Sequence, residues 1–404
     1  MNPAKIVVSG FMLGVERFQT GVSYNPLSSR LHRNPYPTYE RLRARDPVHW
    51  SKLAMSWIVT RYDDVDIVLR NPKIFSNERS SYDTPRSLLT LDPPDHTRLR
   101  SLMSQAFTPA SVHALSERMD DIVSEILAEL DFNSPFDVIE SIAYPLPIIV
   151  ISELLGVRPD DRHSFARWSA DIARSIEPTI SRNESHRVEQ SRDALNQYFS
   201  NVIEERRRQP EDDLISRLVQ AEEGGEKLSH EEMLSLLRLL LIAGNETTKN
   251  LIGNGLLALL RNPDELERLR SDPSLMESAV EEMLRFDSPV QVDLRTVVEN
   301  TLVGSTEMSS GQRVLAVIGA ANRDPEAFPD PNSLDLSRDG RPNMSFGRGI
   351  HHCLGAPLAR LEAAAAFKGM IHGLKEISLE KAPRFRSQLV LRGVESLIVK
   401  ANGF

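Results

Sequence analysis

The only cysteine of this 404-residue chain, Cys353, lies in a loop rich in glycine that leads into an alanine-rich helical pattern. The loop, residues 346–355, reads FGRGIHHCLG. Gly347 and Gly349 lack a Cβ atom, so the backbone there can adopt positive φ angles and pass close to a flat ligand. Pro357 suits a first helical turn, and a helix N-terminus just after the cysteine stabilises a thiolate. Because a thiolate ligand favours O–O cleavage at haem iron, one interpretation is a haem site that activates dioxygen.

Two other interpretations of Cys353 compete with haem ligation. A lone thiol is most often a buried structural residue, and on the cysteine alone that interpretation would be preferred. A zinc site is poorly supported, since His351, His352 and Cys353 are contiguous and a tetrahedral ion needs ligands that wrap around it.

A second group of polar residues interrupts a long apolar segment. Ser229 and Glu232 form a capping-box pattern, and the sequence then stays apolar around most of a helix until about Leu260. This predicts a buried central helix of roughly 48 Å. Residues 243–248, AGNETT, place polar side chains in its middle, where they must be satisfied or useful. Gly244 and the threonine hydroxyls would open a groove for a small ligand or water, although a kinked helix with self-satisfied hydroxyls is an equal alternative.

A third pattern places an acid and a base, Glu282 and Arg285, on one helix face at i and i+3. A second capping-box pattern, Ser274 and Glu277, predicts where this helix begins, and Pro289 closes it. By itself such a pair is more often a surface contact that contributes ~0–1 kcal/mol.

The rest of the chain is predicted to be mainly α with a smaller β part. Proline-punctuated helical patterns recur, and apolar periodicity predicts helices over 119–130 and 191–207. A strand pair is expected around 49–50 and 56–60, and residues 290–317 are strand-like. We expect a single domain over residues 34–404, with residues 1–33 unassigned.

Composition limits the partners. Hydrophobic residues make up 40% of the chain and charged residues 26%, and the net charge is −9. An acidic chain lacks the dominant basic face that nucleic acid requires, so no nucleic acid is expected. No apolar run reaches the ~18–20 residues that span a bilayer, so we expect no membrane association and a cytoplasmic location.

The loop around Cys353 closely resembles the haem-ligand signature of the cytochrome P450 monooxygenases, especially the soluble bacterial ones. The resemblance implies the cytochrome P450 fold, with the long central helix over haem b, iron protoporphyrin IX. It further implies that Cys353 ligates the iron and that His351 contacts a haem propionate. The AGNETT stretch resembles the family segment that borders bound dioxygen, which implies that Glu246 and Thr247 deliver protons.

Other matched segments imply the remaining site residues. Residues 92–100, DPPDHTRLR, resemble the start of a propionate-binding helix, implying contacts from His96 and Arg100, and Arg295 matches a further propionate arginine. Glu282 and Arg285 resemble a buried structural pair of the family. Its usual third partner, an arginine, is replaced by Ser333 here, so we expect Arg338 or Arg341 to complete the network.

The resemblance implies a monooxygenase that inserts one oxygen atom of O2 into a small organic substrate. Electrons would come from a ferredoxin and a ferredoxin reductase, because no flavin or iron–sulfur signature is present. Arg98, Arg348 and Arg360 would offer the donor a basic patch. A peroxide-driven haem peroxygenase and a non-catalytic haem gas sensor are the alternatives.

The same resemblance suggests where substrate would enter and what it would touch. Entry is expected between the loop at 76–90, the region 171–187 and the turn at 289–294. The expected apolar contacts are Ala243, Val290, Val292 and Leu294.

Overall fold

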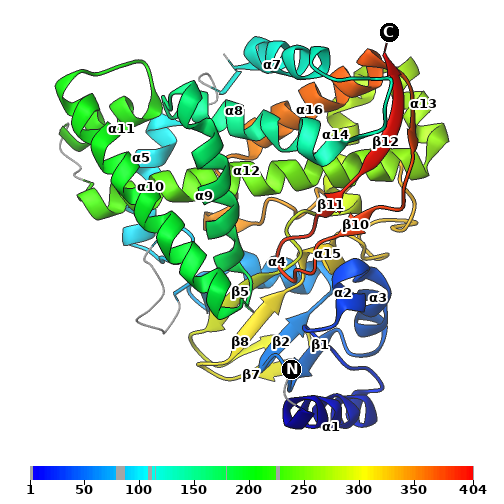
Figure 1. Cartoon of the computed structure of the whole chain (residues 1–404). Coiled ribbons are helices and arrows are strands. Elements are labelled where there is room, and N and C mark those ends of the chain that lie inside the picture. Colours follow the sequence, from blue (N-terminus) through cyan, green and yellow to red (C-terminus); the bar gives the residue numbers. More distant parts are fainter. Residues whose placement is uncertain are drawn as a thin grey trace. The chain divides into compact units, whose positions relative to one another are not determined.

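The computed structural model describes residues 3–78, 87–107, 112–113, 115–178, 180–223 and 228–403, which form two compact units. The first contains Met1–Ser80, Glu281–Cys353 and Phe385–Arg392, and the second contains Ser81–Val280, Leu354–Arg384 and Gly393–Phe404. The chain therefore alternates between the units. Helices dominate the described residues and strands form the smaller part, so the predicted fold class is confirmed (Figure 1).

A five-stranded sheet organises the first unit, in the order β1-β2-β8-β5-β3. Its strands are β1 (Val48–Ser51), β2 (Ser56–Val59), β8 (Arg313–Ala316), β5 (Asp293–Val297) and β3 (Phe75–Ser76). β1 and β2 pair antiparallel with Trp50 opposite Trp57, which confirms the predicted strand pair. β6 (Thr301–Val303) and β7 (Thr306–Met308) form a separate hairpin, whose turn uses Gly304 at φ 57°.

Several helical elements lie wholly within this unit. They are α1 (Pro3–Thr20), α2 (Ser29–Arg33), α3 (Tyr36–Arg45), α4 (Tyr62–Arg70), α15 (Ile318–Ala321) and the 3-10 turn η5 (Gly349–His351). Tyr24 is fully buried and packs in one core cluster with Tyr39 and Ile58. The segment that the sequence left unassigned thus contributes side chains to this core, while the extent of a single domain stays a prediction.

The second unit is mostly helical. Its elements are α5 (Asp95–Ala106), α7 (Ser116–Ala128), the π-helix η1 (Ile139–Ala143), α8 (Pro145–Leu154), η2 (Pro159–Asp161), α9 (Arg162–Ala173), η3 (Arg174–Ile176), α10 (Arg182–Arg208), α11 (Leu214–Glu223), α12 (His230–Arg261), α13 (Pro263–Ser271), η4 (Pro273–Leu275) and α16 (Ala356–Gly373). A sheet of order β4-β12-β9 joins β4 (Phe136–Asp137), β12 (Ile398–Gly403) and β9 (Leu374–Leu379). The remaining strands are β10 (Arg384–Phe385) and β11 (Val394–Ser396).

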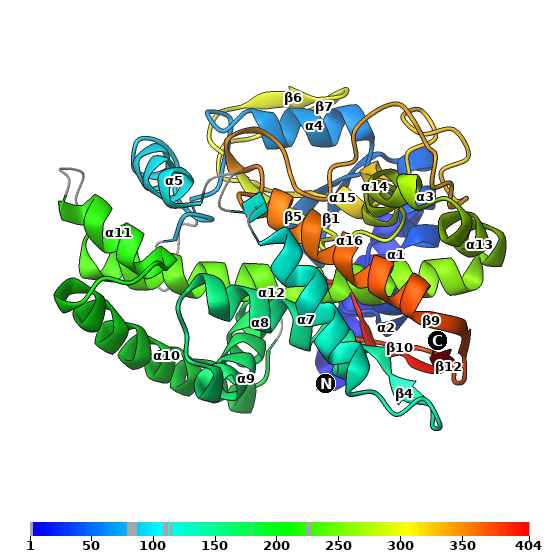
Figure 2. The same cartoon turned by 90° about the horizontal axis from the view of Figure 1, so that it is seen from above.

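The long helix α12 is the predicted central helix (Figure 2). Its capping box is formed: the Glu232 amide donates to the Ser229 hydroxyl at 3.2 Å, and the Ser229 amide donates to the Glu232 carboxylate at 2.8 Å. Most of its later residues are buried, because α8, α9 and α16 pack around it. Within the described residues, no helix is long and apolar enough to cross a membrane. The cytoplasmic location stays a prediction.

The start of α14 (Met276–Phe286) differs from the prediction. Asp272, rather than Ser274, is the capping residue: its carboxylate accepts the Ser274 amide at 3.1 Å and the Ser274 hydroxyl at 2.5 Å. Pro273 then starts the 3-10 turn η4, which leads into the helix. Asp272 is preferred to Ser274 as the capping residue because a charged carboxylate oxygen is a stronger hydrogen-bond acceptor than a hydroxyl.

Candidate functional site

The loop that carries Cys353 is fixed by close packing in the first unit. The Cys353 amide donates to the Phe346 carbonyl at 2.9 Å, and the cysteine is half-buried. Gly349 has φ 68°, and a Cβ atom there would lie 2.7 Å from the Leu69 carbonyl oxygen. Only glycine fits that position, since both the backbone angle and the neighbouring backbone exclude a side chain. The expected positive φ angles are confirmed at Gly347 and Gly349, and the close backbone neighbour of Gly349 is α4, while a close approach to a flat ligand stays a prediction.

Arg348 ties the same loop to α4 and its surroundings. Its guanidinium donates to the Pro342 carbonyl at 2.6 Å and the Tyr62 hydroxyl at 3.3 Å, and lies 3.6 Å from the Asp66 carboxylate. A backbone held at so many points presents the cysteine in one geometry, as a metal ligand requires.

Arg295 and His351 are the other predicted cofactor residues of the first unit. Arg295 lies on β5, is 2% exposed, and donates to the Asp293 carboxylate and to the Leu294 carbonyl. His351 ends η5, two residues before the cysteine, and is half-buried. A buried arginine with rigid fork-like donors suits a carboxylate ligand such as a propionate.

His96 and Arg100 lie one turn apart in α5, in the second unit. His96 is 2% exposed, and burial followed by the charge of Arg100 lowers its pKa. Arg98, between them, forms an ion pair with Glu232 at the start of α12. Arg98 and Arg348 are thus both engaged in ion pairs within their own units, which weakens the idea that they form a basic patch for an electron donor.

The polar insertion of α12 has the predicted local geometry at Thr247. The Thr247 hydroxyl donates to the Ala243 carbonyl at 2.6 Å, and Ala243 itself is exposed. Asn245 donates from its side-chain amide to the Ser169 hydroxyl on α9, at 3.2 Å. The threonine hydroxyl bonds back along the helix, as in the alternative of self-satisfied hydroxyls, and a ligand groove at this place stays a prediction.

Glu246 has a partner that sequence reasoning missed. Its carboxylate forms an ion pair with the ammonium group of Lys249, one turn further along α12, and both side chains are almost fully buried. Lys249 also lies over the ring of Tyr144, 5.2 Å from its centroid. The i, i+3 spacing was visible in the sequence, but a lysine in a helix is normally solvated, so the pattern gave no signal.

A second missed residue is Glu362 on α16. Burial raises its pKa to about 8, although a hydrogen bond with Thr248 of α12 acts in the opposite direction. A neutral carboxyl group therefore lies beside the polar insertion of α12 near pH 7. A lone acid within the alanine-rich run was the only available sequence signal.

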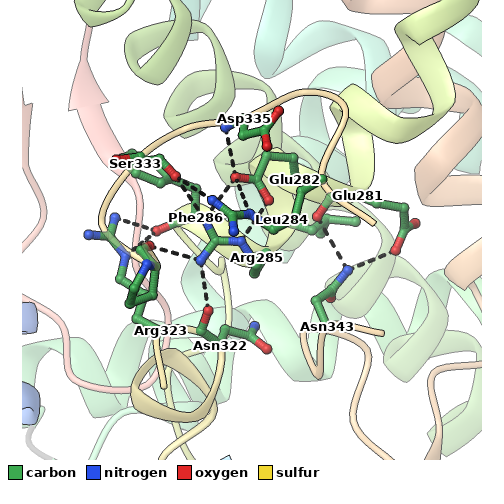
Figure 3. Close-up of polar contacts among 12 residues, drawn as sticks. Glu281, Glu282, Leu284, Arg285, Phe286, Asn322, Arg323, Ser333, Asp335 and Asn343 are labelled. Atoms are coloured by element: carbon green, nitrogen blue, oxygen red, sulfur yellow. Dashed lines mark hydrogen bonds and ion pairs between the residues drawn. The ribbon is translucent and has the colours of Figure 1, made fainter. Parts of the chain in front are cut away.

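Glu282 and Arg285 form a buried and densely hydrogen-bonded charge network in the first unit (Figure 3). Glu282 accepts two hydrogen bonds from Arg285, at 2.6 and 2.7 Å, and one from the Asp335 amide at 3.0 Å. Arg338 donates its Nε at 3.2 Å, so Arg338 supplies the third charge, whereas Arg341 pairs with Asp63.

Backbone carbonyls from the chain after α14 accept the remaining hydrogen bonds of the Arg285 guanidinium. Its donors reach the carbonyls of Asn322 and Pro331, each at 2.9 Å, and of Ser333 at 3.1 Å. The Ser333 backbone thus contributes to the network although its side chain is not the expected cation.

The residues predicted to contact substrate differ in how deeply they are buried. Val292 is 4% exposed and packs in the core cluster with Tyr24 and Tyr39, so it does not present the apolar surface that we expected. Val290 and Leu294 are half-buried and remain candidates. The prediction fails for Val292 because it lies one residue before β5, on the side that the core occupies.

Together these features are typical of haem-thiolate enzymes: a mostly helical chain, one rigidly held cysteine, and polar residues inside a long helix. The family profile described as Cytochrome P450 matches residues 48–386. The polyketide biosynthesis cytochrome P450 PksS of Bacillus subtilis is 38% identical over 403 residues, covering 93% of this chain and 98% of PksS. The vitamin D(3) 25-hydroxylase of Pseudonocardia autotrophica is 38% identical over 400 residues, covering 94% and 97%.

A solved structure agrees. CYP109E1 from Bacillus megaterium in complex with testosterone superposes with a TM-score of 0.87 at 36% identity, covering 93% of this chain and 100% of that one. The chain belongs to the cytochrome P450 family. It is a haem-dependent monooxygenase, as are the relatives named for that activity.

The residues present fit a haem group. Among the described residues, no group of three or more His, Cys, Asp or Glu side chains could hold a metal ion. Cys353 offers a single thiolate, which is the ligand chemistry that haem iron accepts from a protein. Buried Arg295 supplies a cation suited to a carboxylate of that group.

Proposed function

We propose that Cys353 is the proximal ligand of haem b, and that His96, Arg100, Arg295 and His351 hold its propionates. The observation that carries this proposal is the rigid loop in which Gly349 is packed against a backbone carbonyl and Cys353 is fixed by its own amide. Bound haem supplies dioxygen activation, and the helix that begins at Ala356 stabilises negative charge on the sulfur.

We further propose that Glu246 and Thr247 deliver protons for dioxygen reduction. In this scheme the Glu246 carboxylate takes up a proton and passes it to the Thr247 hydroxyl, which releases its own proton on the accessible side of α12. In the resting structure the Thr247 hydroxyl donates its one proton to the Ala243 carbonyl, which leaves the lone pairs of its oxygen to accept a proton. That bond opens when the hydroxyl releases its own proton. Each residue ends the cycle in the protonation state in which it began.

The names of the relatives support a proposal for the substrate class. Their names include a vitamin D(3) hydroxylase and a 6-deoxyerythronolide B hydroxylase, and one related structure holds testosterone. We propose hydroxylation of a bulky, mainly apolar substrate, contacted by Ala243, Val290 and Leu294. A panel of steroids and macrolactones that leaves the haem spectrum unchanged would contradict this class.

The electron donor is proposed to be a ferredoxin with its reductase. The chain has a single cysteine, so it carries no four-cysteine iron–sulfur cluster of its own and needs an external donor. Full turnover with peroxide alone, at the rate supported by the donor system, would contradict this and favour the peroxygenase alternative.

The test of the whole assignment is the spectrum of the reduced, carbon-monoxide-bound protein. Wild type should show the red-shifted Soret band of a cysteinate ligand, and Cys353→Ser should lose that shift. Ser309→Ala, a serine in an exposed turn, is the control for handling. A wild-type spectrum in Cys353→Ser would refute the assignment.

A further inference from the structure

Lys249 is a charged residue in the interior of α12 for which the proposed reaction has no role. Its side chain is 1% exposed and that of Glu246 is 3% exposed. The two lie three residues apart on the same helix, and the ammonium group also faces the Tyr144 ring. Both members of the pair, and the aromatic face beside them, therefore belong to the interior of the second unit.

Stability alone does not account for this pair. Removing an ammonium group and a carboxylate from water costs several kcal/mol for each ion, and a buried pair is often no more stable than apolar residues of the same size. Tyr144 adds a cation–π contact that recovers only part of that cost. The pair affects function through the charge and the orientation of the Glu246 carboxylate.

The first effect is on charge. An isolated carboxyl group with 3% exposure would favour its neutral form, since burial disfavours the charged one. The adjacent ammonium group reverses that preference. The contrast with Glu362 is direct: that carboxyl is also buried, has Thr248 as its hydrogen-bond partner, and has a pKa raised to about 8.

The second effect is on orientation. Thr247 points its hydroxyl back to Ala243, while the Glu246 side chain is held toward Lys249 and the Tyr144 ring. The ion pair therefore fixes the side-chain rotamer that Glu246 has between proton transfers.

We propose that Lys249 is a positioning residue that keeps Glu246 ionised inside the helix and holds it ready to accept a proton for Thr247. This inference rests on the proposed role of Glu246. Among the described titratable groups, Tyr144, which lies between η1 and α8, faces the Lys249 ammonium, and Glu362 of α16 is hydrogen-bonded to the neighbouring Thr248.

The test uses the haem-loaded protein and four variants: Lys249→Met, Lys249→Arg, Glu246→Gln and the double variant Lys249→Met/Glu246→Gln. The first readout is independent of activity. In the infrared spectrum at neutral pH, Lys249→Met should gain the carbonyl stretch of a protonated carboxyl, because burial then favours neutral Glu246. The wild type, Lys249→Arg and the double variant should lack that band.

The second readout is the fraction of consumed reductant that appears as product. Lys249→Met should lower it about as much as Glu246→Gln does, the double variant no further, and Lys249→Arg should restore most of it. Arg207→Met removes a cation from an exposed i, i+3 pair with Glu204 on α10 and is the matched control, with no change expected. The double variant replaces both charges by neutral groups and keeps the test decisive if Lys249→Met does not fold. Its fraction of reductant converted to product should then equal that of Glu246→Gln, and a larger loss in the double variant would overturn the inference.

Absence of the new band in Lys249→Met, or additive losses in the double variant, would overturn the inference. The two failures are distinguishable. Full coupling in Glu246→Gln refutes the proton role itself, whereas uncoupling in Glu246→Gln with full coupling in Lys249→Met refutes only the role of Lys249.

Discussion

Replacing Glu282 with alanine should destabilise the first unit severely. The Glu282 carboxylate accepts hydrogen bonds from Arg285, Arg338 and the Asp335 amide, and its residue is 3% exposed. Without it, the Arg285 guanidinium stays 2% exposed with its positive charge unbalanced, and the loop at Asp335 loses the acceptor that ties it to α14.

The expected magnitude follows from the geometry. Breaking a buried ion pair by removing one partner costs about 3–5 kcal/mol, because a buried charge is left without compensation. The carbonyls that Arg285 already uses reduce this cost but carry no full negative charge. A loss of about 3 kcal/mol is a large fraction of the ~5–15 kcal/mol that typically stabilises a folded protein.

The assay is urea unfolding, followed through tryptophan fluorescence, together with haem content per chain. Trp50 and Trp57 of the first unit and Trp168 of the second all contribute to that fluorescence. Glu282→Ala should shift the midpoint strongly and lower haem content, since the same unit carries the Cys353 loop. Glu204→Ala, which removes the acid of an exposed i, i+3 pair, should cost less than about 1 kcal/mol. Equal midpoints and haem contents for the two variants would refute the reasoning.

Three further predictions follow from local geometry. Gly349→Ala should lower haem retention, because the new Cβ atom would lie 2.7 Å from a backbone oxygen. Gly311→Ala, also at positive φ but with open space around it, should retain haem, and equal retention in the two variants would contradict the packing argument. Burial lowers the pKa of His49, but its hydrogen bonds to Asp46 and Glu16 outweigh burial and raise the pKa to about 8. The stabilisation of the fold by protonated His49 is therefore complete below pH ~6.5 and disappears as the pH rises through 8. Between pH 6 and 9 the wild type should lose about 2 kcal/mol more unfolding free energy than His49→Gln. Parallel pH profiles of unfolding free energy would refute this prediction. Thr247→Ala should divert reductant to peroxide and lower product formation by up to ~10²–10⁴-fold, while Thr247→Ser keeps the hydroxyl and most of the product, and normal product yield in Thr247→Ala would exclude the hydroxyl from proton delivery.

The sequence was informative wherever a single local rule decided the structure. The capping box at Ser229 and the apolar run after it located α12 to within a residue or two, because helix starts depend on neighbouring side chains. The missing cation beside Glu282 was also predictable, since a buried network needs its charges balanced, and Arg338 provides it.

The features that the sequence did not predict depend on packing between segments that are distant in sequence. The family resemblance assigned Val292 to a substrate surface, but whether this residue faces substrate or core depends on Tyr24 and Tyr39, far away in the chain. Lys249 was overlooked because burial of a lysine is decided by the elements packed around α12. Spacing identifies which residues share a helix face but gives no indication of what covers that face.

The two buried charge networks differ in what must move to break them. The Glu282 network joins α14 to a loop through backbone groups, including the Asp335 amide, so it cannot open unless that loop shifts. The pair of Glu246 and Lys249 lies within one turn of one helix, so rotation of a side chain separates it while every hydrogen bond of the backbone stays in place. The second arrangement suits a group that takes up and releases a proton in each cycle, because no loop has to move for the pair to open. The first arrangement suits a scaffold that keeps the Cys353 loop rigid.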